Sequence, residues 1–159
     1  MKLIRLLLFL TLLNTGYSLL MPFSNYKITE NYVLSNGTKM ENVDLETFRI
    51  IDQALAKDKN NIYLGSKIIE NVDVEYFMPI KGINGSLYYK DKDNVYFLEI
   101  DRLIKINGAH SKSFIVYDYI TAEDKESKYF RETKITDKNT IKDWEKRVEL
   151  IKEGVYFPL

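Results

Sequence analysis

Four carboxylates lie close together in one stretch of the chain, and paired carboxylates can hydrolyse glycosidic bonds. Such hydrolysis needs two of these groups about 5 to 10 Å apart across a cleft, with one of them acting as the acid. Lysines alternate with the acidic residues here, as is typical of a solvated charged surface, and no spacing places two of the carboxylates across a cleft. A carboxylate-dependent hydrolase therefore stays an alternative. The four carboxylates are Asp118, Glu123, Asp124 and Glu126.

Few residues of the chain are suited to metal binding or to nucleophilic catalysis. The stretch from Asp91 to Asn94 offers only two carboxylates, whereas a calcium loop supplies six or more oxygens. The chain has no cysteine and one histidine, His110, which excludes disulfides, cysteine-based zinc sites and two-histidine metal sites. We therefore expect no catalytic residue, no cofactor and no metal site.

One phrase recurs along the chain. Its first copy, at residues 58–64, is DKNNIYL, and it returns as DKDNVYF at 91–97 and as DKESKYF at 124–130. A second phrase accompanies it as ENVDLETF at 41–48, ENVDVEYF at 70–77 and AHSKSF at 109–114. The chain is therefore expected to hold roughly three copies of a unit of about thirty residues, a period typical of stacked supersecondary structure.

Each copy is expected to form a β-hairpin, with a linking strand that leads from it to the next copy. The aspartate that opens the phrase can accept hydrogen bonds from backbone amides two residues on, so it favours a turn. Gly65-Ser66 and Asn36-Gly37 are two-residue turns of the kind that close hairpins. A lone hairpin is marginally stable in water, so the copies must pack on one another.

A single turn of helix is expected after each hairpin. Asp44 and Asp73 would cap it, each with a phenylalanine plug four residues later on the same face. His110 stands in the same place before Phe114, so it is interpreted as a substituted cap rather than a catalytic base.

Tyrosine is abundant, with 12 residues, and favours half-buried strands and recognition surfaces. The adjacent Tyr88 and Tyr89 must point to opposite faces of a strand, so one is expected to face outward if the other is in the core. The alternative is that such tyrosines only fill cross-strand pairs. The candidate partner-binding residues are Tyr63, Tyr88, Tyr89 and Tyr96.

Residues 140–154 predict an amphipathic helix of about three turns. Thr140 and Asp143 are expected to cap its start and Gly154 to end it. We expect this helix to close one end of the repeat stack. The alternatives are a partner-binding helix and a membrane-surface helix, and the mixed surface charge argues against the membrane-surface helix. Its apolar residues recur at helical spacing: Ile141, Trp144, Val148 and Ile151.

The N-terminus has the layout of a secretory signal peptide. Basic Lys2 and Arg5 precede an apolar run over residues 6–13, and the small residues Gly16 and Ser18 favour cleavage after Ser18. The apolar run is shorter than the roughly 20 residues of a spanning helix, and an uncleaved anchor is the alternative. The chain has 23 basic and 23 acidic residues, and this balance argues against nucleic-acid binding.

The recurring phrases resemble the DKNNY family of exported bacterial repeat proteins. The resemblance covers residues from about 31 to 130, with DKNNIYLGSK and NVDVEYF as its best match. It is weakest at DKESKYF, where Glu126 and Ser127 replace two asparagines. The resemblance implies export and a repeat architecture, and it carries over no catalytic residues.

Together these patterns predict a mainly β (α+β) protein of tandem β-hairpin units with one-turn helices, closed by a C-terminal amphipathic helix. Its parts would be a signal peptide (1–18), an N-terminal extension (19–30), a repeat domain (31–136) and a C-terminal helix and tail (137–159). We expect an exported, non-enzymatic binding or structural module of the periplasm or cell surface, without a membrane span after signal removal. Its partner would be another protein or an envelope glycan. The alternatives are a hydrolase of envelope polymers and an immunity-type protein that binds a toxin.

Cleavage after Ser18 would leave an exported protein that begins at Leu19. Intact-mass spectrometry of the protein recovered from the periplasm or the medium of a bacterial host is expected to show the loss of residues 1–18. A full-length mass confined to the membrane fraction would contradict cleavage and favour the anchor.

Overall fold

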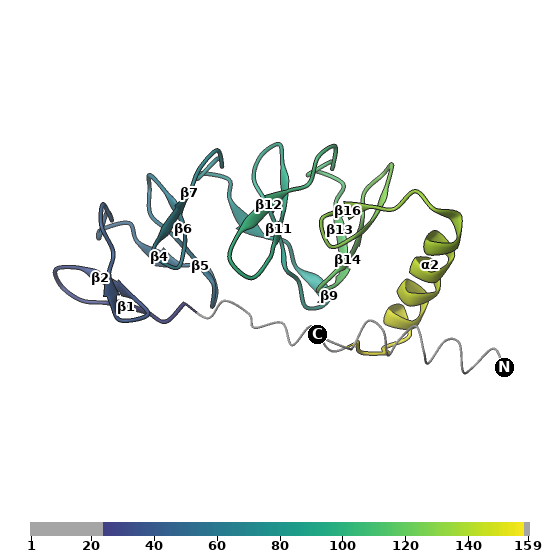
Figure 1. Cartoon of the computed structure of the whole chain (residues 1–159), viewed down its shortest axis with the longest axis horizontal. Coiled ribbons are helices and arrows are strands. Elements are labelled where there is room, and N and C mark those ends of the chain that lie inside the picture. The colour runs from purple at the N-terminus through teal and green to yellow at the C-terminus, as the bar shows by residue number, and fades with distance from the viewer. Residues whose placement is uncertain (1–23, 158–159) are drawn as a thin grey trace.

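The computed structural model describes residues 24–157, which form a row of small β-sheets followed by one helix (Figure 1). These residues contain 16 strands in four sheets, so the predicted mainly β class is confirmed. The predicted signal peptide and most of the predicted N-terminal extension lie outside the described residues.

Four successive units make up the row, and each is an antiparallel meander. Unit 1 has β1 (Tyr26–Ile28), β2 (Val33–Ser35) and β3 (Thr38–Lys39). Unit 2 has β4 (Arg49–Ile50), β5 (Leu55–Lys57), β6 (Ile62–Leu64) and β7 (Lys67–Ile69). Unit 3 has β8 (Met78–Pro79), β10 (Tyr88–Lys90), β11 (Val95–Leu98) and β12 (Leu103–Lys105). Unit 4 has β13 (Ile115–Asp118), β14 (Thr121–Glu123), β15 (Lys128–Phe130) and β16 (Thr133–Lys134).

Two further elements complete the fold. Strand β9 (Gly82–Asn84) leaves unit 3 and pairs in parallel with β13 of unit 4. Helix α2 (Lys138–Lys152) lies at the end of the row opposite β1 (Figure 1).

The predicted hairpin turns are confirmed, but more than one strand lies where the sequence predicted a single linking strand before each phrase, as β4 and β5 do before Asp58. Asn36-Gly37 joins β2 to β3 and Gly65-Ser66 joins β6 to β7. A further strand precedes each phrase and pairs with the strand inside it, as β5 does with β6. The repeats also begin earlier than the predicted residue 31, because β1 pairs with β2 through Tyr26 and Ser35.

A buried aspartate opens the turn before the third strand of units 2, 3 and 4. Asp58, Asp91 and Asp124 are 1%, 4% and 8% exposed. In each, Oδ1 accepts hydrogen bonds from the backbone N–H groups two and three residues on, at 2.7–3.0 Å. The recurring phrase is therefore the same turn built three times.

The other carboxylate oxygen ties that turn to two distant parts of the unit. Oδ2 accepts from the hydroxyl of the tyrosine five residues on, at 2.7 Å in Asp58, 2.5 Å in Asp91 and 3.0 Å in Asp124. It also accepts from a backbone N–H in the preceding inter-unit connection. Those donors belong to Asp44 (2.9 Å), Asp73 (3.2 Å) and His110 (2.9 Å), so the sequence prediction that His110 replaces the two aspartates is confirmed.

The hydrogen bonds fix the charge state of these side chains. Burial alone would raise the pKa of Asp58, Asp91 and Asp124, but the tyrosine hydroxyl and backbone N–H donors outweigh it and lower the pKa below the usual value. Burial, together with the adjacent carboxylate, raises the pKa of Tyr63 and Tyr129 to about 12. The folded state therefore favours an ionised aspartate bound to a neutral tyrosine.

The connections between units form one hydrogen-bonded turn and not the expected turn of helix. Residues 45–47, 74–76 and 111–113 make these turns. Two residues before Asp44, Asp73 and His110 the backbone is left-handed, with φ of 57° at Asn42, 60° at Asn71 and 77° at Gly108. Asparagine and glycine tolerate this region best, and the reversal it produces leaves too few helical residues for a helix.

The phenylalanine plugs lie in like surroundings, as the repeat interpretation predicts. Phe48, Phe77 and Phe114 are buried, and each packs on the tyrosine of the following phrase. The ring centroids are 5.9 Å apart for Phe48 and Tyr63, 6.0 Å for Phe77 and Tyr96, and 5.3 Å for Phe114 and Tyr129. The plug thus covers the ring whose hydroxyl binds the buried aspartate.

A second tyrosine contact joins unit 1 to unit 2 and unit 3 to unit 4. The Tyr26 hydroxyl donates to the carbonyls of Ala54 (3.0 Å) and Gly65 (3.2 Å). The Tyr88 hydroxyl donates to those of Ile120 (2.7 Å) and Arg131 (3.0 Å), which occupy the matching positions of unit 4. Units 2 and 4 have Leu55 and Thr121 where units 1 and 3 have these tyrosines, so the units alternate in type.

Replacing Asp91 by Asn is expected to lower the free energy of unfolding by about 1.5 to 3 kcal/mol, because the amide loses charge-assisted hydrogen bonds and one acceptor. Chemical denaturation measures this change. Asp93→Asn is the matched control, since Asp93 is exposed, and should stay within about 0.5 kcal/mol. Equal effects of the two changes would contradict the role assigned to Asp91.

The pH dependence of stability should have two arms. The lowered aspartate pKa values contribute stability above the unfolded pKa of about 4, which is lost as pH falls through the folded values. The raised tyrosine pKa values contribute stability below about pH 10, which is lost as pH rises towards 12. Thermal unfolding across pH should show a plateau between these limits, with a shallower acid arm in Asp91→Asn.

Candidate functional site

The four tyrosines predicted to bind a partner are core residues, so they have no exposed face for a partner. Tyr63 and Tyr88 are 0% exposed, Tyr89 4% and Tyr96 3%. The prediction assumed that one face of each strand meets water. Neighbouring units instead pack on both faces, so Tyr88 reaches unit 4 while Tyr89 binds Asp52 of unit 2 at 2.7 Å.

The clustered carboxylates have separate environments. Asp118 is 1% exposed and paired with Arg147, and Asp124 belongs to the turn network. Glu126 is exposed and pairs with His110 (3.2 Å) and Lys125 (3.4 Å). Glu123 alone lies beside a groove, where it accepts a hydrogen bond from the Tyr117 hydroxyl.

The described part of the chain, residues 24–157, has no group of three or more histidine, cysteine or acidic side chains placed to hold a metal ion. In the DKDN turn, the two oxygens of Asp91 already accept from Tyr96, two backbone N–H groups and the Asn94 amide. The Asp91 carboxylate therefore stabilises the fold through these hydrogen bonds.

Helix α2 provides one wall of the groove. It begins earlier than predicted, because Asp137 and not Thr140 is its N-cap and accepts from the Thr140 backbone N–H at 2.8 Å. Gly154, with φ of 91°, follows its last residues as predicted. Trp144, Val148 and Ile151 are buried against unit 4, and the Trp144 indole N–H donates to the Tyr129 carbonyl at 3.1 Å.

An ion pair anchors the helix to unit 4. The Arg147 guanidinium donates to Asp118 Oδ2 at 2.5 and 2.9 Å and to the Thr121 hydroxyl at 3.0 Å. Asp118 occupies the position that Asp52 has in unit 2, since Oδ1 of each accepts from the backbone N–H groups two and three residues on. Arg147 of α2 therefore contacts unit 4 where Tyr89 of unit 3 contacts unit 2.

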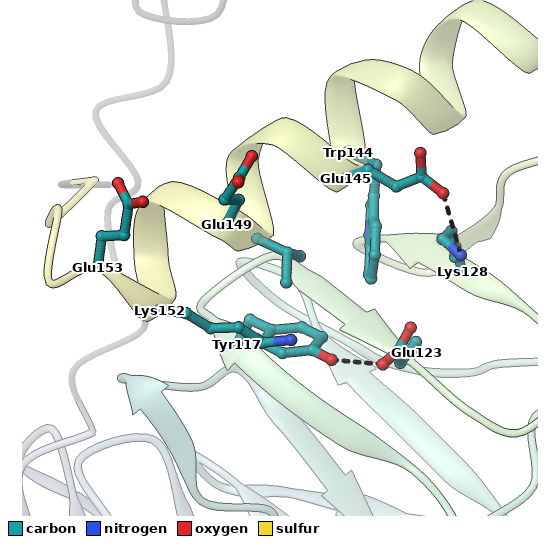
Figure 2. Close-up of a pocket in the computed structure, with 9 residues that line it drawn as sticks. Tyr117, Glu123, Lys128, Trp144, Glu145, Glu149, Lys152 and Glu153 are labelled. Atoms are coloured by element: carbon teal, nitrogen blue, oxygen red, sulfur yellow. Dashed lines mark hydrogen bonds and ion pairs between the residues drawn. The ribbon is translucent and has the colours of Figure 1, made fainter.

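The groove runs between α2 and strands β13–β15, with a volume of about 390 Å³ (Figure 2). This volume falls in the range of small-ligand sites. Tyr117 and Trp144 meet edge to face, with centroids 5.6 Å apart. Burial raises the pKa of Tyr117, and its hydrogen bond to the Glu123 carboxylate raises it further, so this hydroxyl stays a donor.

Two lysines of the chain lie over the rings of the groove. The Lys128 ammonium lies 5.1 Å from the centroid of Trp144 and 3.6 Å from the Glu145 carboxylate. The Lys152 ammonium lies 5.2 Å from the centroid of Tyr117. Both rings therefore already accept cations, an interaction worth about 0.5 to 1 kcal/mol at exposed sites.

Acidic residues predominate around the groove. Its lining contains four glutamates and only two lysines. The glutamates are Glu123, Glu145, Glu149 and Glu153. Glu149 and Glu153 stand on the helix rim, with their carboxylates turned away from the sheet (Figure 2). Neither has an ion pair or side-chain hydrogen bond within the described residues.

The charges of α2 predict only a mixed surface from the sequence, and the groove was not predicted. One sequence feature could have indicated it, because Glu145, Glu149 and Glu153 recur every fourth residue and must share one face of a helix. Lys128 and Glu123 join that face only through tertiary packing.

Comparisons with known proteins give one family. A model described as the DKNYY family matches residues 10–100, which is more than half of the chain. It is the family that the recurring phrases resemble, under the near-identical spelling DKNNY. No curated protein and no solved structure matches the chain. Among residues 24–157, the one helix lacks the length and apolar content needed to cross a membrane.

Replacing Arg147 by Ala is expected to lower the free energy of unfolding by about 3 to 5 kcal/mol, because Asp118 would be left buried without its countercharge. Chemical denaturation measures this change. Lys146→Ala, on the exposed side of α2, is the control and should have little effect. If the two variants proved equally stable, the ion pair would not anchor α2.

Proposed function

Because the chain belongs to the DKNYY family, we propose that it is an exported, non-enzymatic repeat module that binds another macromolecule through the groove beside α2. The macromolecule is a protein or an envelope glycan. The family model ends at residue 100, so the groove lies in the part of the chain beyond the match.

The aspartate and tyrosine of each repeated phrase support this assignment, because both are buried and hydrogen-bonded within the fold. The aspartate of each phrase is buried with both oxygens bound, and its tyrosine is buried beneath a phenylalanine plug. Such side chains have no free polar atom and no exposed face with which to contact a substrate. Function is therefore sought where this pattern ends, at unit 4 and α2.

Helix α2 serves in this proposal as the cap of the row. Arg147 binds Asp118 as the next unit's Tyr89 binds Asp52, and Trp144 fills the apolar surface that a further unit would cover. Terminal units of repeat proteins need such a replacement, because the last apolar face would otherwise meet water. The cap also creates the groove, since a helix laid on a sheet leaves a concave margin along its side.

A non-enzymatic role is favoured over hydrolysis because, of the four carboxylates that the sequence offered for it, only Glu123 lines the groove. Asp118 and Asp124 are committed to Arg147 and to the turn network. Glu123 stays beside the groove, and it accepts from Tyr117. An immunity-type function, in which the partner is a toxin, is one form of the proposed binding.

Export rests on the N-terminal layout of basic start, apolar run and small residues. A protein exported without cysteine has no disulfide to stabilise it, and the aspartate network, present in three units, supplies a repeated hydrogen-bonded anchor instead.

The single observation that carries the proposal is the concave, aromatic and acidic groove between α2 and β13–β15. A photoreactive benzoylphenylalanine in place of Glu149 should form a discrete higher-mass adduct when the protein is irradiated in its native envelope extract. The same residue in place of Lys105, exposed on β12, is the control and should form none.

Mass spectrometry of the adduct identifies the partner. Repeated extracts that give no adduct at position 149, or equal yields at both positions, would contradict binding through the groove.

A further inference from the structure

We infer that residues 155–157, which follow α2, form a strap that holds α2 on unit 4 by closing over the Arg147–Asp118 ion pair. This inference goes beyond the proposed binding function, because it concerns how α2 is kept in place and needs no partner. Neither Arg147 nor any residue of the strap lines the groove, so the strap lies outside it.

A chain reversal at the end of α2 directs the strap back towards the sheet. Gly154 has a φ of 91°, the left-handed conformation that glycine adopts just after many helices. The backbone N–H groups of Gly154 and Val155 donate to the carbonyls of Ile151 and Leu150, at 3.0 and 2.9 Å. These two bonds close the helix end and fix the direction in which the chain leaves it, back towards β9 (Figure 1).

The strap is anchored on β9. The Asn84 side-chain amide donates to the Val155 carbonyl at 3.2 Å, across 71 residues of sequence. Asn84 is also the residue of β9 that pairs with Asp118 of β13. Tyr156 follows beside Tyr119, whose pKa is raised by burial and further by this neighbour. The strap therefore meets the sheet at the position of the carboxylate that belongs to the ion pair.

Phe157 covers the ion pair itself. The Cζ atom of the Arg147 guanidinium lies 4.1 Å from the centroid of the Phe157 ring, and the ring also packs against the apolar cluster beneath α2. The edge of the guanidinium donates to Asp118 and to the Thr121 hydroxyl, so the ring contacts its face. The side chains of Arg147 and Asp118 are only 16% and 1% exposed. An ion pair shielded from water in this way is screened less and attracts more strongly.

The strap thus joins α2 to two strands that precede it in sequence, β9 and β13. Without the strap, one face of the Arg147 guanidinium would meet water, and α2 would depend more on the packing of Trp144 and its apolar neighbours. We therefore expect α2 to detach from unit 4 more often when the strap is lost. Units 1 and 2 lie at the other end of the row and should keep their stability (Figure 1).

Hydrogen exchange of the backbone amides, measured by mass spectrometry on the full mature protein, tests the strap directly. In Phe157→Ala the amides of α2 should exchange about threefold to thirtyfold faster, as expected for the loss of a partly shielded cation–π contact. The amides of unit 2 should keep their rates. Tyr32→Ala is the matched control, because the Lys39 ammonium lies 5.9 Å from the Tyr32 ring centroid in unit 1. This control should leave the exchange of α2 unchanged.

Further variants separate the contacts of the strap. Phe157→Tyr keeps the aromatic face and should retain the original exchange rates in α2. Phe157→Leu keeps apolar bulk without the aromatic face, so it should recover only part of the protection that Phe157→Ala loses. Asn84→Ala removes the donor to the Val155 carbonyl and should speed the exchange of α2 by about twofold to tenfold.

Unchanged exchange of α2 in Phe157→Ala would overturn the inference. Equal acceleration in α2 and unit 2 would also overturn it, since that result would mean a general loss of stability. Full protection of α2 in Phe157→Leu would show that the ring does not act through Arg147. None of these measurements involves a partner, so the binding function is tested separately by the photo-adduct.

Discussion

The buried aspartate carboxylate that begins each phrase is the interaction on which the rest of the structure depends. One oxygen shapes the turn, and the other joins the tyrosine of the next strand to the connection that precedes the unit. With every lone pair directed at a donor, a charge can be buried in a short meander without a basic partner. The same arrangement in Asp91 and Asp124 places the phenylalanine plugs, and through them the packing between units.

Much of this arrangement could be predicted from the sequence, because turn chemistry is local. The sequence shows the aspartate that precedes two backbone N–H donors and the glycine or asparagine at each chain reversal. It also shows the phenylalanine at a fixed distance from them. The equivalence of His110 to Asp44 and Asp73 was predictable for the same reason, since all three share the same backbone N–H contact whatever their side chain.

Burial and the groove could not be predicted in this way, because both depend on which surfaces meet. The side chains of Tyr88 and Tyr89 point to opposite faces of β10, as neighbours on any strand do. Neighbouring units cover both of these faces, and the sequence pattern of one unit does not show this. The strands that precede each phrase are short and lack a distinct alternation. The groove joins Glu123 and Lys128 of unit 4 to α2, and this contact exists only after the helix has packed.

The alternation of unit types limits how such an array can change in length. Tyr26 and Tyr88 reach forward from the odd units, whereas Asp52 and Asp118 of the even units accept from whatever follows, be it Tyr89 or Arg147. Adding one unit would set two surfaces of the same type against each other and leave a buried carboxylate facing no donor. Adding two would preserve every partner, so an array of this kind can lengthen in steps of two units under the same terminal helix.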